Sequence, residues 1–81
     1  MTTIKVGGID AGRAPSPMQL ATWRQDWAAL GLTAWQPDPA SPTTHFKCTT
    51  TAPLAQSRAV VNPVLTAWVG AAPGHRDFTV T

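Results

Sequence analysis

The chain has 81 residues, of which 43% are hydrophobic and 12% are charged, and its formal net charge is +2 at pH 7. This composition excludes a disordered tail, and the length predicts one compact domain over residues 1–81. The Lys, Arg and Asp residues are scattered along the chain, which excludes an acidic mimic of DNA and shows no clustered basic element of the kind that binds nucleic acid.

Cellular location is inferred from the single cysteine and from the lack of long apolar runs. Cys48 is alone, so no internal disulfide is possible and a reducing cytoplasm is expected. No apolar run approaches the ~20 residues of a membrane span, and the N-terminal sequence lacks the layout of a signal peptide. We therefore expect a cytoplasmic protein without membrane contact.

A glycine-rich stretch near the N-terminus has nearly the spacing of a phosphate-binding loop. Gly7 and Gly12 fit the pattern, but Arg13 replaces the lysine and Ala14 stands where the metal-binding hydroxyl should be. We therefore expect ordinary turn glycines and no nucleotide cofactor. The minor alternative is an anion site at the start of the following helix, using Arg13 and Ser16.

The first helix is predicted from Pro17 to about Leu30. Ser16 is a suitable N-cap, proline is tolerated at the first helical position, and Gly31 is a suitable stop. Four apolar residues recur at helical spacing and form one stripe: Leu20, Trp23, Trp27 and Leu30. The remaining surface of this helix has only Arg24 and Asp26 as charged residues, so its outer face is unusually plain.

A second helix is predicted over residues 53–69, with Gly70 as its terminator. Its apolar stripe consists of Leu54, Val61, Val64, Leu65 and Trp68. Pro63 lies almost opposite that stripe, so either one kinked helix or two short helices broken at Asn62 are allowed.

The remaining segments alternate like strands. Three alternating pairs are Ile4 and Val6, Phe46 and Cys48, and Phe78 and Val80, and a shorter strand is expected at residues 32–35. The order β-α-β-β-α-β indicates an α+β domain of the ferredoxin-like split βαβ type, with an antiparallel sheet and two helices on one face. Alternatively, the pair of glycines at residues 7–8 could turn a hairpin.

Metal binding and nucleophilic catalysis are both disfavoured by the strand pattern. On a strand, His45 and Cys48 point to opposite faces, so they cannot share a metal ion with His75. A cysteine nucleophile would need His45 or His75 as base and Asp77 as orienter. Cys48 alternates in phase with the buried positions, where a lone cysteine is usually a small hydrophobe, so we expect no enzyme, no metal and no cofactor.

The outward face of the sheet is a candidate for weak nucleic-acid binding. It carries Lys5, His45 and Lys47, and its topology is similar to that of ferredoxin-like RNA-binding domains. Those domains stack bases on aromatics of two central strands, whereas this chain offers at best Trp35. A solvated polar face is therefore the preferred interpretation.

Four tryptophans in so small a domain favour a protein-binding role. Trp35 lies outside both helical stripes and leads into a proline-rich loop, and Trp and Arg dominate interface hot spots. The candidate contact residues are Trp35, Gln36, Asp38 and Arg24. We expect a non-enzymatic module that occupies the surface of a protein partner, and we expect that partner to be a larger host complex.

The small size of the chain and its lack of recognisable motifs lead to a more specific expectation about its function. Small motif-free domains of this kind serve phages and mobile elements as stoichiometric inhibitors of host machinery, including anti-CRISPR proteins, which would place this chain in a bacterial host cytoplasm. Its oligomeric state is expected to be a monomer or weak dimer.

Overall fold

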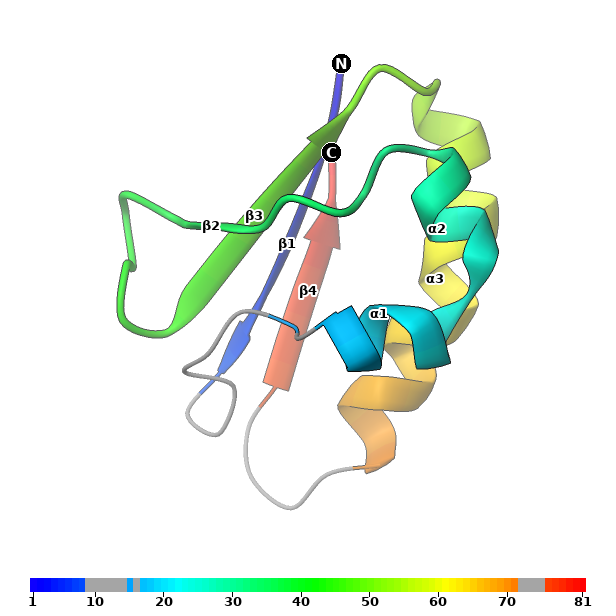
Figure 1. Ribbon diagram of the computed structural model, residues 1–81. Coiled ribbons are helices and arrows are strands. Elements are labelled where there is room, and N and C mark those ends of the chain that lie inside the picture. Colours follow the sequence, from blue (N-terminus) through cyan, green and yellow to red (C-terminus); the bar gives the residue numbers. More distant parts are fainter. Residues whose placement is uncertain (9–14, 16, 72–75) are drawn as a thin grey trace.

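The computed structural model describes residues 1–8, 15, 17–71 and 76–81. Its elements in chain order are β1 (Thr2–Gly8), α1 (Pro17–Trp23), α2 (Gln25–Ala29), β2 (Gln36–Pro37), β3 (His45–Thr50), α3 (Leu54–Ala71) and β4 (Arg76–Val80) (Figure 1). The four strands form one antiparallel sheet in the order β2-β3-β1-β4. The helices lie together on one side of this sheet (Figure 1), which confirms the α+β class.

β1 is a central strand and hydrogen-bonds to a different neighbour at alternate residues. The Gly8 N–H donates to the Thr44 carbonyl at 3.2 Å, on the β3 side. Thr3 and Thr81 exchange two backbone hydrogen bonds of 2.8 and 2.9 Å, which continue the ladder on the β4 side. Gly7 and Gly8 are therefore paired within β1, and both the turn interpretation of Gly7 and the hairpin alternative are wrong.

The prediction of which strand residues point toward the helices is confirmed. The core combines one face of the sheet with one face of the helices, and its buried residues are Ile4, Val6, Trp23, Trp27, Leu32, Cys48, Val61, Leu65 and Val80. Phe46 and Phe78 pack against it from the same face of the sheet. β1, β3 and β4 therefore direct alternate residues toward the core, as the period of two requires, whereas both residues of β2 are exposed.

The first helix is divided, so the described part of the chain has three helices rather than the two expected. Arg24 has extended backbone angles (φ 169°, ψ 150°), which end α1 at Trp23 and let α2 begin at Gln25. Helices this short gain most of their stability from tertiary contacts rather than from propensity, and the buried Trp23 and Trp27 on either side of the break supply such contacts. Gly31, with φ 79°, ends α2 as expected.

α3 is one continuous helix that contains Pro63, so the alternative of two short helices is wrong. Pro63 is exposed and lies away from the buried Val61 and Leu65, where a missing backbone hydrogen bond is easily tolerated. The helix extends past Gly70, its expected end, to Ala71.

The short strand lies later than expected. Residues 32–35 are not a strand, because the Leu32 N–H donates to the Trp27 carbonyl at 2.9 Å and the chain is still turning out of α2. The strand forms instead at Gln36–Pro37, inside the segment expected to be a loop. In the described part of the chain, no helix has the length and apolar character needed to cross a membrane.

Candidate functional site

A histidine–aspartate pair spans the outer face of the sheet above Gly7. Gly7 lies between His45 on β3 and Asp77 on β4. His45 Nε2 is 3.1 Å from Asp77 Oδ1, and its Nδ1 is 2.8 Å from the Thr44 hydroxyl oxygen. A Cβ at Gly7 would lie 2.5 Å from His45 Cγ and 2.6 Å from the Thr44 carbonyl oxygen. Only glycine therefore lets the imidazole lie flat enough to reach Asp77.

This pair is not joined by the cysteine of the nucleophile hypothesis. Cys48 is buried on the helix side of β3, and burial raises the pKa of its thiol. His45 and Asp77, the base and orienter considered above, do contact each other, but on the opposite face of the sheet. His75 lies outside the described residues, and among the described residues no group of three metal-ligating side chains occurs.

The basic residues of the nucleic-acid hypothesis do share one face. Lys5 and Lys47 are direct cross-strand partners, and His45 lies two residues along β3 from Lys47. Two of these three residues have an acidic neighbour: Lys5 Nζ is 3.5 Å from Asp38 Oδ2, and His45 contacts Asp77. The positive charge on this face is therefore partly balanced.

Asp38 is held by the loop that it belongs to. Its Oδ1 accepts a hydrogen bond of 3.2 Å from the Ala40 N–H, and its own N–H donates to the His45 carbonyl at 2.9 Å. The Ala40 hydrogen bond and, to a smaller extent, the Lys5 and Lys47 ammonium groups lower the pKa of Asp38, against the opposing effect of desolvation. Asp38 is buried, so its first role is to fix this loop on the sheet.

The other candidate contact residues are separated by the fold. Trp35 is half-buried against the core with its indole N–H enclosed, whereas Gln36 is exposed on β2. Arg24 is exposed between α1 and α2, where its Nε lies 3.7 Å from Asp26 Oδ2. The role of these residues in partner binding stays a prediction.

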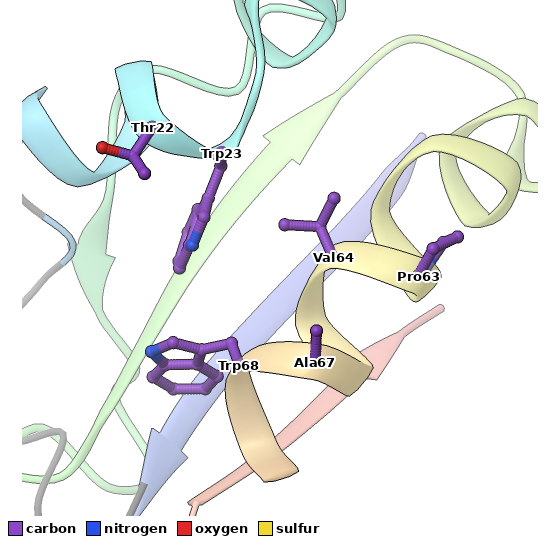
Figure 2. Close-up of a pocket in the computed structure, with 6 residues that line it drawn as sticks. All are labelled: Thr22, Trp23, Pro63, Val64, Ala67 and Trp68. Atoms are coloured by element: carbon purple, nitrogen blue, oxygen red, sulfur yellow. The ribbon is translucent and has the colours of Figure 1, made fainter. Parts of the chain in front are cut away.

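An apolar groove of about 490 Å³ lies between α1 and α3. It is lined by Thr22, Trp23, Pro63, Val64, Ala67 and Trp68 (Figure 2). The rings of Trp23 and Trp68 meet edge to face, with centroids 6.0 Å apart, at one end of the groove, and Pro63 lies at the other (Figure 2). The Arg76 guanidinium lies 4.7 Å from the Trp68 ring centroid and fixes that indole further.

A second apolar hollow, of about 480 Å³, opens on the helix layer. Its lining residues are Leu20, Ala21, Arg24, Gln25, Trp27, Ala28, Leu32 and Thr33. The Trp23 and Trp27 rings, 4.6 Å apart, link the walls of the two hollows. In the part of the chain that the structure describes, the helix layer therefore carries these two apolar hollows.

Sequence reasoning missed both hollows, although part of the signal was present. Ala67 and Pro63 flank the buried stripe of α3, and such small or ring-shaped side chains cannot fill the space beside a tryptophan. The phosphate-loop residues Gly12, Arg13 and Ser16 lie outside the described residues. Comparison of the chain with protein-family models, with curated proteins and with solved structures finds no match.

Proposed function

We propose that this domain is a non-enzymatic protein-binding module that engages its partner through the helix layer. The observation that carries the proposal is the groove between α1 and α3, with Trp23 and Trp68 in its wall. Trp23 is already buried in the core, whereas Trp68 is only half-buried. Tryptophan is among the residues that contribute most at protein interfaces, because it buries a large rigid surface for little loss of conformational entropy.

The surface around the groove is poor in charge. The exposed apolar residues of α1 and α2, together with those of α3 that line the groove, include Met18, Ala21, Ala28, Ala29, Pro63 and Ala67. Arg24 and Asp26 lie 3.7 Å apart and balance each other, and Arg58 Nη2 donates to the Val80 carbonyl at 3.2 Å. A partner can cover this layer without desolvating unpaired charges. The layer is therefore suited to form the buried centre of a protein interface, where charged residues are rare.

The sheet face gives weaker support to nucleic-acid binding. Lys5 and His45 already contact carboxylates, so few counterions would be released when they approach a phosphate backbone. The outward residues of the central strands include no Phe, Trp or Tyr on which a base could stack. The partner that fits the helix layer is a protein presenting aliphatic side chains, such as one face of an amphipathic helix.

The experiment places one charge in the groove without removing a core side chain. Ala67→Glu adds a carboxylate to the groove wall, and Ala59→Glu adds the same charge at an exposed position of α3 that does not line it. Immobilised wild-type protein is incubated with nuclease-treated bacterial lysate, and the retained protein is purified and titrated by calorimetry. We expect Ala67→Glu to weaken binding at least ~10-fold, the effect of burying an unpaired charge, and Ala59→Glu to change it little.

Other results would contradict the proposal. Equal effects of the two glutamates would place the interface elsewhere, and a Gln36→Arg variant would then test the β2 segment beside Trp35. Retention only in lysate that still contains nucleic acid, lost with Lys47→Glu, would favour the sheet face. Inhibition of a larger host complex stays a prediction from the sequence, and it would be tested on the activity of the purified partner.

We also propose that the fold is a variant of the ferredoxin-like split βαβ arrangement in which the first helix is divided at Arg24. The order β4-β1-β3-β2 with antiparallel neighbours supports this assignment, because that arrangement places the first and third strands at the centre. Proton–proton contacts measured by NMR between Ile4 and both Cys48 and Val80 would test it.

A further inference from the structure

The two edges of the sheet differ in how they are protected. β2 is only two residues long, and the Asp38 N–H donates to the His45 carbonyl at 2.9 Å. Because alternate residues face the neighbouring strand, position 37 faces outward, and Pro37 has no N–H to offer there. Shortness and an outward-facing proline are common ways in which proteins prevent pairing at a sheet edge.

β4 has neither form of protection. It runs for five residues without proline. Thr3 and Thr81 exchange hydrogen bonds, and the register then directs the backbone groups of Asp77 and Thr79 toward β1 and those of Phe78 and Val80 outward. Arg58 donates to the Val80 carbonyl, but the N–H and carbonyl of Phe78 have no partner in the described part of the chain.

We propose that the chain forms a two-fold symmetric dimer in which β4 pairs antiparallel with β4 of a second copy, with Phe78 opposite Phe78. The two Phe78 residues then exchange their N–H and carbonyl groups in two hydrogen bonds, and the two sheets become continuous. This register aligns all five residues of β4 with all five of the second copy.

The alternative registers are less favourable. Centring the pairing on Asp77 would place two carboxylates directly opposite each other, which is destabilising. Centring it on Thr79 would shorten the overlap, because only residues 78–80 of each β4 would then pair with each other. The register centred on Phe78 instead places Asp77 opposite Thr79 of the second copy, twice in each dimer.

Because Thr79 lies opposite Asp77 of the second copy, the direction in which a charged substitution at Thr79 changes the dimer affinity can be predicted. Thr79 is exposed on the outer face, so its substitution leaves the core intact. Thr79→Lys would add two attractive pairs with Asp77 and should tighten the dimer by about 2- to 30-fold, whereas Thr79→Asp should weaken it by a similar factor. Within one copy Thr79 faces Lys5, so the effects on monomer stability have the opposite signs. Thr49→Lys and Thr49→Asp, at an exposed position of β3, are the matched controls.

The dimer is measured on the full chain by sedimentation equilibrium from micromolar to millimolar concentration at low salt. We also expect amide exchange at Phe78, measured by NMR, to slow as concentration rises, while exchange at Thr79, which is bonded within the sheet, does not depend on it. A monomer throughout this range would overturn the proposal. A dimer with concentration-independent exchange at Phe78, or with equal responses to the Thr79 and Thr49 variants, would also overturn it, because another surface would then join the copies.

Discussion

Gly7 provides the sharpest test of the outer sheet face. In Gly7→Ala, the new methyl group would meet His45 Cγ at 2.5 Å and the Thr44 carbonyl oxygen at 2.6 Å. The imidazole can swing away only by losing its 3.1 Å contact with Asp77, and the carbonyl is part of the backbone and cannot move freely. Overpacking of this kind costs about 1–3 kcal/mol, which exceeds the ~0.5–1 kcal/mol that alanine normally gains over glycine in a strand.

Two other glycines serve as matched controls for the same chemical change. Gly70 lies in α3 with nothing near its missing side chain, so Gly70→Ala should stabilise the protein by up to about 1 kcal/mol. Gly31 has equal space but a φ of 79°, so Gly31→Ala should cost ~1–2 kcal/mol from backbone strain alone.

Urea unfolding followed by tryptophan fluorescence measures the three variants on one scale. For a domain of this size, 1 kcal/mol corresponds to ~4–8 °C in Tm, so thermal unfolding gives an independent check. The expected order of stability is Gly70→Ala above wild type, with Gly31→Ala and Gly7→Ala below it. A Gly7→Ala protein as stable as wild type would refute the close approach of His45 to β1.

Two further predictions concern titratable groups. Because the pKa of Asp38 is lowered in the folded chain, its carboxylate stabilises the fold at neutral pH, and that contribution is lost as the pH falls through about 4 and below. The stability difference between wild type and Asp38→Asn should therefore shrink between pH 7 and pH 3 in urea titrations, and a constant difference would contradict this interpretation. Cys48, buried and with a raised pKa, should react with an aromatic disulfide at neutral pH far more slowly than in urea. Equal rates in the two conditions would show that the thiol is accessible.

The periodic features of the fold were predictable, because they arise from burial on one face. The alternation of Ile4 and Val6 and the stripe of Val61, Leu65 and Trp68 follow from where apolar side chains must point, whatever the neighbouring element is. The α+β class was predictable for the same reason.

Features that depend on a particular neighbour were not predictable. The requirement for glycine at position 7 comes from His45, which is remote in sequence and adjacent only across the sheet, so the sequence alone indicates a turn there. Nothing near Arg24 marks a helix end, and its extended backbone appears only where α1 and α2 pack together. The groove likewise requires Trp23 and Trp68 to meet from two helices. Secondary-structure propensity and the spacing of apolar residues carry no information about contacts between residues that are remote in sequence.

The position of β1 also determines how the chain can fold. β1 must pair with β3 and with β4, and its last hydrogen bonds join Thr3 to Thr81. Forming such contacts requires long loops to close, which costs chain entropy before the contacts contribute favourable energy. The domain therefore has a high contact order and should fold in milliseconds or longer rather than microseconds. Until the C-terminal strand arrives, one side of β1 stays unpaired and the apolar face of the helices lacks part of its sheet. The interval before β4 docks is therefore the stage at which this chain is most exposed to aggregation.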